Sequence, residues 1–424
     1  MVRPTSGVGD ADMRLLISLS ALLLSTLFVQ MGIGALRPFD AISGQALGFS
    51  PVEIGLLASG HFAGFLLGCI FGPHLVRRAG HSRAFAVMAG VAVISIIAHP
   101  LLPDAYFWAV IRVLSGFSVA GCYTLIESWL QAKITNNIRG RVFSIYRMID
   151  MSGQIMANAI IATLTPASYV SYNLLAIIMC LAILPLALTQ SKEPELPEAI
   201  NYQPFFAIRI SPLAGLGVVV AGLSTATFGS VGPIYAIAVG LDLSQIAMFL
   251  VVSTVGGMIS QLPAGILADK LSRRAVLLVF SIMASGLCVV MSFPISDIIL
   301  WGIPVVYVMS FMFGFTTFPI YSICAAHASD FVSQDRMITL SASLIFLYAT
   351  GAIVSPLLAG LIIETYGAEM MFSMIAAAHI LLMLFTIYRN FARPAEQRRR
   401  YAYVPRTSMF IASILRPRRN GSKH

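Results

Sequence analysis

Among the ionisable side chains that stand inside apolar segments, five are the first candidates for any chemistry. They are His61, Arg112, Glu127, Arg147 and Asp150. A charged group at the centre of a membrane helix costs about 2.5–3.5 kcal/mol on insertion scales, so each of them requires a partner or a function. Carboxylates and imidazoles exchange protons, and guanidinium groups bind anions or carboxylates. The set predicts proton coupling or substrate binding within a membrane.

Arg112 stands one to two turns inside the apolar segment 105–131. In one interpretation it binds an anionic substrate or tunes a nearby proton site. In the other it is a structural guanidinium that bonds carbonyl groups of neighbouring helices. Fifteen residues of helix separate it from Glu127, which is about 22 Å, so the two side chains must act at different levels.

Glu127 and Arg147 are each ten residues from Asn137, the centre of the connection between segments 105–131 and 142–164. Antiparallel neighbours place such residues at similar depth, which predicts an ion pair. Asp150 lies three residues after Arg147 and competes for it. A carboxylate that changes partner on protonation would couple proton entry to helix movement. The alternative is a static brace.

Further ionisable residues lie at other depths. His61, beside Gly60 and Gly64, is either a proton relay at mid-membrane or a neutral, hydrogen-bonded imidazole. His327 and Asp330 are expected at a gate or a helix end. Arg37 and Asp40 are expected either to form an outer gate pair or to cap a helix.

The composition explains why these groups must be placed inside a membrane. The chain has 424 residues, of which 58% are hydrophobic and 11% charged, with a mean hydropathy of +0.86. A soluble domain carries far more charge, and a spanning helix needs roughly 20 apolar residues. Twelve spans are predicted, at residues 14–37, 51–76, 82–102, 105–131, 142–164, 168–189, 211–238, 243–268, 274–293, 296–326, 337–362 and 368–388.

Charges in the connections alternate along the chain. One set of connections carries Arg77, Arg78, Arg83, Lys133, Arg139, Arg141, Lys192, Arg209, Lys270, Arg273, Arg274 and Arg336. The opposite set carries Asp104, Asp242, Asp297, Glu364 and Glu369, with Arg37 as its only basic residue. The positive-inside rule places the basic set and both termini in the cytoplasm.

An internal repeat predicts the fold. Residues 48–54 match 240–246 at an offset of 192, and residues 116–118 and 123–125 match 314–316 and 321–323 at an offset of 198. We expect an all-α integral membrane protein with twelve transmembrane helices in two pseudo-symmetric six-helix bundles. The expected divisions are a cytoplasmic tail (1–13), an N-terminal bundle (14–189), a cytoplasmic linker (190–210), a C-terminal bundle (211–388) and a basic tail (389–424).

The basic tail holds ten basic residues and one acidic residue, Glu396. Because it follows a spanning helix, we expect it to contact anionic lipid rather than nucleic acid, with a short interfacial helix near residues 406–416. The five cysteines lie in apolar segments without metal-ligand spacing. The sequence contains no phosphate-binding loop and no nucleophile with a base, which argues against ATP-driven transport, an enzyme and a cofactor.

Several motifs resemble the major facilitator superfamily. Its loop signature is matched by Gly265, Leu267, Ala268, Asp269, Lys270, Arg273 and Arg274. In the first-half copy Arg77 takes the acidic position, which puts a gating ion pair there in doubt. Its helix 4 signature is matched by Arg112, Gly116 and Ala120. Residues Gly351, Ser355, Pro356, Ala359 and Gly360 resemble an exporter element that usually lies on helix 5.

Residues 125–130, 139–142, 319–321 and 326–330 resemble the YcaD-like subgroup of that superfamily. The resemblance implies a secondary transporter of a small solute that works by alternating access, coupled to protons, as a monomer in the bacterial inner membrane. Two alternatives remain: a lipid or amphiphile flippase on the same fold, and a non-transporting membrane sensor or assembly partner.

Overall fold

The computed structural model describes residues 8–133, 139–188, 203–294, 298–300, 302–333 and 336–392. Within these ranges, the side chains of residues 8–18, 73–77, 79, 132–133, 139–141 and 392 are not described. The interfacial helix expected near residues 406–416, most of the expected linker and most of both tails therefore lie outside the description.

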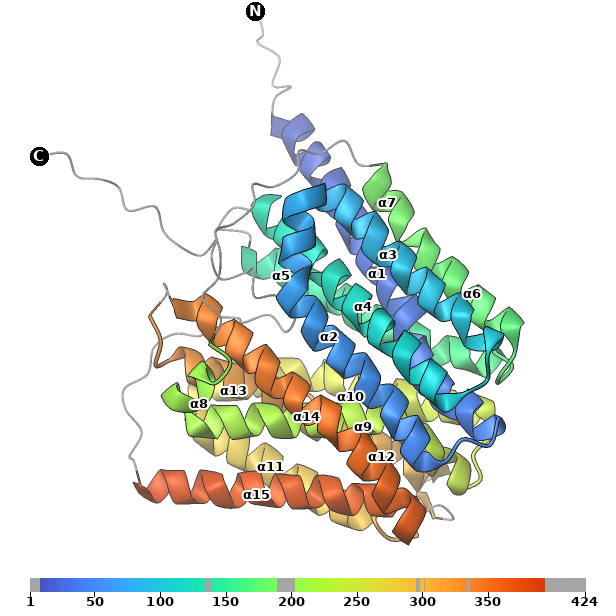
Figure 1. Cartoon of the computed structure of the whole chain (residues 1–424). Coiled ribbons are helices and arrows are strands. Elements are labelled where there is room, and N and C mark those ends of the chain that lie inside the picture. Colours follow the sequence, from blue (N-terminus) through green and yellow to red (C-terminus); the bar gives the residue numbers. More distant parts are fainter. Residues whose placement is uncertain are drawn as a thin grey trace, which may run out of the picture.

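Nearly all of the described chain is helical (Figure 1). The first half contains α1 (Val8–Ala46), α2 (Pro51–Ala79), α3 (His81–Ala98), η1 (His99–Leu101), α4 (Ala105–Lys133), α5 (Arg139–Ile160), η2 (Ile161–Thr163), α6 (Tyr169–Leu181) and α7 (Ile183–Ala187). The second half contains α8 (Phe206–Ile210), α9 (Pro212–Ala238), α10 (Leu243–Lys270), α11 (Arg273–Met291), α12 (Val305–Thr317), α13 (Pro319–Ser329), α14 (Met337–Tyr366) and α15 (Met370–Ala392).

These helices form two bundles, α1–α7 and α9–α15, which Figure 1 shows side by side. Within the described residues, eleven helical segments are long and apolar enough to span a membrane. Helix α5 is not among them because Arg147, Asp150, Gln154 and Asn158 make it polar, yet it packs between α1 and α10. The predicted membrane fold of two six-helix bundles is confirmed.

Two predicted spans are wrong in their boundaries. The first was expected to end at residue 37, but α1 continues past Pro38 to Ala46; proline is tolerated in membrane helices because neighbouring groups satisfy the freed carbonyl. The tenth was expected to begin at residue 296. Instead, β1 (Ile299–Leu300) and β2 (Ile303–Pro304) pair as an antiparallel hairpin that turns at Gly302, whose φ is +81°.

The internal repeat is visible in how the helices touch. A Cβ on Gly64 or Gly116 would collide with the backbone of the partner helix, so α2 and α4 are in backbone contact there. A Cβ on Gly256 or Gly314 would likewise collide with backbone, so α10 and α12 are also in backbone contact. The two pairs are related by the offsets of 192 and 198 that the sequence repeat shows. Small residues allow such close approach in membranes, where tight packing rather than water release drives helix association.

Among the described residues, the largest hydrophobic cluster that the two bundles share lies at one of their ends. The end of the bundles that carries Asp104, Asp242 and Glu364 is called the acidic end. The opposite end, which carries Lys270 and Arg336, is called the basic end. At the acidic end a single cluster joins Ala41, Ile42, Ile54 and Ile161 of the first half to Val231, Ile234 and Tyr235 of the second. The large clusters that extend toward the basic end each belong to one half.

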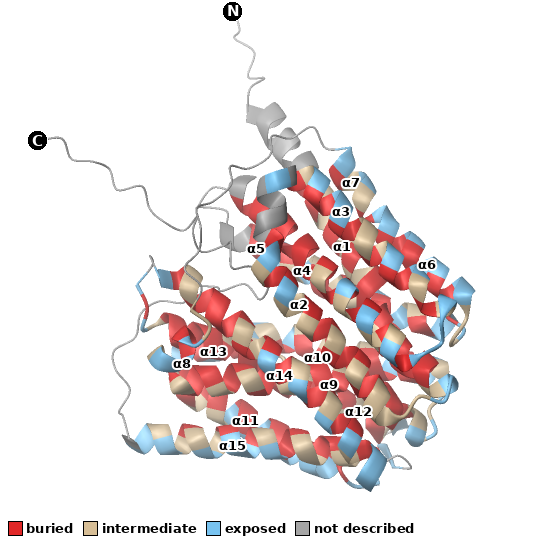
Figure 2. Ribbon diagram, viewed as in Figure 1, coloured by how far each residue is buried: buried red, intermediate tan, exposed pale blue. Residues whose placement is uncertain are grey.

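The outer surface of the bundles is apolar. Figure 2 shows exposed residues along the outer faces of α6 and α15, and these include Ile177, Leu381 and Leu384. Apolar side chains on the outside of a helical bundle are the surface expected to face lipid.

The glycine contact between α2 and α4 generates a test. In Gly116→Ala the new methyl group meets the carbonyl oxygen of His61, whereas in Gly90→Ala on α3 nothing lies within 4 Å. We expect Gly116→Ala to destabilise the purified protein by about 1–3 kcal/mol, because the helices must separate. Thermal unfolding in detergent would measure this, and equal stability of the two variants would contradict the packing described here.

Candidate functional site

A cavity of about 220 Å³ lies between the two bundles. The first half lines it from α1, α2, α4 and α5, and the second half from α9, α10, α14 and the junction of α12 with α13. Helices α3, α6, α11 and α15 contribute no lining residue. The cavity therefore depends on both halves, and it uses corresponding helices of each.

The two walls differ in chemistry. All of the charged side chains and the histidine that line the cavity come from the first half: Arg37, His61, Glu127, Arg147 and Asp150. The second half contributes the hydroxyl groups of Thr225, Ser253, Thr254 and Tyr348 and the rings of Phe228 and Phe318. The structure brings together four of the five sequence-predicted coupling candidates, and it adds Arg37 to them.

The carboxylates in the cavity have different partners. Arg147 Nη1 lies 2.5 Å from Asp150 Oδ2, so the guanidinium is held by the competing carboxylate. Glu127 Oε1 accepts a hydrogen bond of 3.0 Å from the Tyr146 hydroxyl. Because Tyr146 and Arg147 are adjacent on α5, Glu127 and Asp150 are connected through one turn of helix.

Tyr123 joins this cluster to α1. Its hydroxyl is 2.8 Å from Asp150 Oδ1 and also hydrogen-bonded to Gln30 Oε1. Both of these oxygens accept, and a hydroxyl has only one hydrogen to donate. If Asp150 is protonated, it donates to Tyr123, and Tyr123 is free to donate to Gln30. The protonation state of Asp150 therefore sets the direction of this short hydrogen-bond chain.

A row of amide side chains continues from Gln30 to the second half. Gln30 Nε2 donates to Gln154 Oε1 at 2.5 Å, and Gln154 Nε2 donates to Asn158 Oδ1 at 2.9 Å. Asn158 Nδ2 then lies 3.1 Å from Leu250 O and 3.0 Å from Thr254 Oγ1, both on α10. Sequence reasoning missed these residues because amide side chains carry no charge. The signal that could have found them is the presence of these three amide side chains on two membrane segments, α1 and α5.

Arg37 and Asp40 point into different environments. Arg37 lines the cavity, with Nη2 3.5 Å from Gln154 Oε1 and its guanidinium 5.7 Å from the Phe62 ring centre. Asp40 is buried in the first half. The interpretation of Asp40 as a helix cap is wrong, since α1 continues for six more residues to Ala46.

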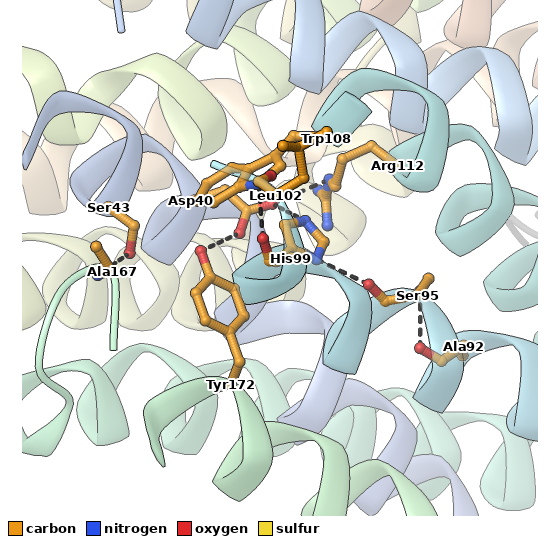
Figure 3. A network of polar contacts seen from close by, with 10 residues as sticks. All are labelled: Asp40, Ser43, Ala92, Ser95, His99, Leu102, Trp108, Arg112, Ala167 and Tyr172. Carbon is orange, nitrogen blue, oxygen red and sulfur yellow. Dashed lines mark hydrogen bonds and ion pairs between the residues drawn. The ribbon is translucent and has the colours of Figure 1, made fainter. Parts of the chain in front are cut away.

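Asp40 lies at the centre of a buried network (Figure 3). Its Oδ2 is 3.1 Å from His99 Nε2 and 3.4 Å from Arg112 Nε, and its Oδ1 accepts a hydrogen bond of 3.2 Å from the Tyr172 hydroxyl. His99 stacks on Tyr172 with ring centres 5.1 Å apart. Arg112 is therefore paired with a carboxylate, which neither interpretation of its sequence position included. His99 and Tyr172 were not predicted either. His99 directly follows α3 and Tyr172 lies on α6, two helices that do not line the cavity.

His61 is buried in the cavity wall, 4% exposed, with its ring edge-on to Phe62 at 5.4 Å. Among the described residues its Nδ1 has no hydrogen-bond partner. The expectation of a histidine bonded within the protein is not met at this nitrogen, which leaves it able to bond a molecule in the cavity.

The predicted gate residues of the second half lie at the basic end. Arg273 Nη2 is 3.2 Å from Asp330 Oδ1, Arg274 Nη1 donates to the carbonyl of Arg389 at 3.3 Å, and His327 lies edge-on to Phe331. Burial raises the pKa of Asp330 above its ordinary value, and Arg273 opposes that effect. Asp269 is exposed. The side chain of Arg77 is outside the described residues.

Gly351 and Pro356 lie at helix contacts. Gly351 packs against the backbone of Val219 on α9, within the second half. The carbonyl of Pro356 packs against Gly55 on α2, across the two halves. Gly351 and Gly55 allow the close approach of α14 to α9 and to α2. Pro356 therefore lies at a contact between the halves that would have to separate if the acidic end opened.

The direct hydrogen bonds that cross between the halves, within the described residues, lie beside the cavity or toward the acidic end. They are those of Asn158 with α10 and that of Ser59 Oγ with Ile353 O, at 2.6 Å. Together with the shared core, they close the cavity at the acidic end.

Comparison with known proteins agrees with this architecture. The sequence model of the Major Facilitator Superfamily matches residues 22–213 and 214–419. A protein of Escherichia fergusonii called "Uncharacterized MFS-type transporter YcaD" is 23% identical over 348 residues, which are 81% of this chain and 88% of that protein. The protein of the same name from Salmonella newport is 23% identical over 345 residues, 79% of this chain and 86% of that protein.

Solved structures share the fold. The nucleoside transporter NupG superposes with a TM-score of 0.68 at 14% identity, over 88% of this chain and 98% of that one. An inward-facing, occupied bacterial homologue of the human lysosomal transporter Spinster gives 0.69 at 15% identity, over 90% and 98%. A D-xylose–proton symporter gives 0.62 at 13% identity, over 93% and 98%.

The bridge formed by Asn158 generates a prediction about conformation. Asn158→Ala removes its two contacts with α10, a loss of about 1–1.5 kcal/mol that should raise the population open at the acidic end roughly tenfold. Spin labels at Leu102 and Tyr366, both exposed and in opposite halves, would report it as a longer distance. The background would carry Cys180→Ala, since Cys180 is exposed.

Thr163→Ala is the matched control for this experiment. Thr163 lies near Asn158, but its exposed hydroxyl bonds only its own helix, at Ile160 O. An unchanged distance distribution in Asn158→Ala would mean that the amide does not hold the acidic end closed.

Proposed function

Because this chain is a multi-pass membrane transporter that belongs to the major facilitator superfamily, we propose that it is a secondary transporter that moves a small solute by alternating access, coupled to protons. The observation that carries the proposal is the cavity between the halves, which is closed at the acidic end and carries a carboxylate cluster on one wall. Alternating access requires a central site whose two ends open in turn.

Proton coupling is supported by the arrangement of Asp150. While it is ionised, it holds Arg147 and accepts from Tyr123. A proton on Asp150 removes the charge that holds Arg147, and the guanidinium then turns toward Glu127, the carboxyl group at the same level. The same proton reverses the hydrogen bond to Tyr123 and so changes the contact of α4 with Gln30 on α1. Proton binding thus changes how α1, α4 and α5 hold one another.

The geometry favours a small solute over a lipid. Contacts between α2 and α14 run from Gly55 with Pro356 to the apolar cluster of Cys69 and Ile345, which closes that side of the cavity toward the membrane. Polar groups also line the cavity at more than one level, from Glu127 to Arg37. A flippase would need a lateral opening and charge at one level, and a sensor would need no cavity.

The cavity lining suggests what the solute is like. Amide groups, hydroxyl groups, two guanidinium groups and two carboxyl groups share the cavity lining with aromatic rings such as Phe62 and Phe228. Such a wall suits a polar molecule with an apolar or planar part, held by hydrogen bonds.

The remaining sequence expectations form part of the same proposal. The basic end faces the cytoplasm of a bacterial cell, both termini lie on that side, and the basic tail contacts anionic lipid. The protein works as a monomer, with units at residues 14–189 and 211–388 joined by the linker 190–210. Arg273 with Asp330 and Arg274 with Arg389 stabilise the basic end during the cycle.

A test of coupling needs no knowledge of the solute. Proteoliposomes with purified protein would be incubated with a defined mixture of metabolites under an imposed pH gradient, and the lumen analysed by mass spectrometry. A gradient of about one pH unit is worth about 1.4 kcal/mol and drives about tenfold accumulation for one proton per solute. We expect Asp150→Asn and Glu127→Gln to lose this accumulation, since neither mimic can take up and release a proton.

Asp104→Asn is the control, because Asp104 is an exposed carboxylate that caps α4 at Phe107 N and an asparagine can still accept that bond. Accumulation that does not respond to the gradient in the wild type would refute coupling. No uptake of any solute beyond that of empty vesicles would refute transport of the tested classes.

A further inference from the structure

A second, much smaller cavity lies beside the large one, toward the acidic end. Its volume is about 10 Å³, and it is lined by Arg37, Asp40, Arg112 and Ser230 with apolar walls from Ala41, Ile54, Leu57 and Ala58. This space suits a single water molecule or a small ion. Arg37 lines both cavities.

Two buried donors at this small cavity are not satisfied by the protein. Arg112 is 1% exposed and Ser230 is 2% exposed. Among the described residues, Arg112 Nη1 and Ser230 Oγ have no hydrogen-bond partner. Buried polar groups are almost always bonded, and a buried guanidinium most of all. The geometry thus requires an acceptor between α4 and α9.

The hydrogen bonds of His99 determine the charge around this space. Its Nδ1 is 2.8 Å from the carbonyl oxygen of Ser95, which can only accept, so Nδ1 carries a hydrogen. Its Nε2 is 3.1 Å from Asp40 Oδ2. That contact is a hydrogen bond only when a proton lies between the two atoms, on the ring or on the carboxyl group. In either form the His99–Asp40 pair has no net charge.

Asp40 is shared between His99 and Arg112, so this one carboxylate does not balance the positive charge at the cavity. The other group that faces Asp40, the Tyr172 hydroxyl, is a neutral donor, and Arg37 adds a second positive charge to the cavity wall. The small cavity is positively charged, buried and supplied with donors, which is the environment that binds an anion.

We propose that this small cavity is a binding site for one monovalent anion, held by Arg112 Nη1, Ser230 Oγ and the charge of Arg37. Arg112 lies on α4 of the first half and Ser230 on α9 of the second, so the anion joins the two halves and stabilises the conformation closed at the acidic end. The shared ligand chemistry is a single negative charge with accepting lone pairs. Its source is either a free halide or the carboxylate end of a solute.

The test measures thermal stability of the full-length protein in detergent while chloride, bromide or acetate replaces sulfate, a divalent anion without a carboxylate, at constant pH and ionic strength. We expect the Tm to rise and saturate with the anion. Saturation with halides identifies a free ion, and saturation with acetate alone identifies a carboxylate. Ser230→Ala should weaken the apparent affinity roughly tenfold, as expected for the loss of a hydrogen bond to a charged group.

Two further variants distinguish a binding site from a structural effect. Ser281→Ala is the control: Ser281 is fully buried in the second half but bonds Leu277 O of its own helix, so it should respond to anions like the wild type. His99→Gln keeps a donor for Asp40 but not the shared proton, so it should weaken anion affinity; it also removes the stacking on Tyr172, so its Tm shift is measured against the same variant without anion.

Bromide also offers a measurement that is independent of variant folding, because its anomalous scattering in crystals should give a peak between Arg112 and Ser230. The proposal is overturned if neither halide nor acetate shifts the Tm, or if Ser230→Ala responds like the wild type and no bromide peak is found. In those cases a water molecule would satisfy both donors.

Discussion

Charges in this protein are placed by the cost of burying them where no water can reach. Three guanidinium groups (Arg37, Arg112 and Arg147) and three carboxylates (Asp40, Glu127 and Asp150) lie in or beside the interior of the first half. Each requires a partner within reach, because an isolated charge in hydrocarbon is costly. That requirement orders the first half: it draws α3 and α6 to α1 and α4 through His99 and Tyr172, and it holds α5 against α4 through Tyr123.

The scaffold is symmetric, but the chemistry is not. The glycine contacts of α2 with α4 recur between α10 and α12, so both halves are assembled by the same close backbone approach. Among the described residues that line the cavity, those of the second half include no charged side chain and offer mainly hydroxyl groups and aromatic rings. A rigid, mostly neutral wall opposite an ionisable one allows a change of protonation in one half to alter the fit between both halves.

The repeat, the loop charges and the apolar segments were sufficient to predict the fold, because these signals are local and act along one chain segment at a time. The buried ionisable residues were also found this way, since any charge in an apolar segment is conspicuous. Of their partners, only a local one was predicted, Asp150 for Arg147. The pairing of Arg112 with Asp40 joins helices far apart in sequence, and no spacing rule relates them.

Neutral groups were harder to detect than charges. Gln30, Gln154 and Asn158 form a continuous hydrogen-bonded row only because α1 and α5 are in contact and α5 meets α10. The end of α1 was misplaced for a related reason: Pro38 and Asp40 suggest a helix end in isolation, but the tertiary partners of Asp40 keep the helix intact through Ala46.

Helix α1 connects the three polar systems of the first half. Gln30 contacts the Asp150 cluster through Tyr123, Arg37 lines both cavities, and Asp40 belongs to the buried network. Ten residues of helix span about 15 Å from the first of these to the last. In the proposed cycle, a movement of α1 that follows a change at Asp150 must therefore also move Arg37 and Asp40 relative to Arg112 and Ser230. Because α1 also packs directly on α9, the helix that contacts the Asp150 cluster also contacts the second half.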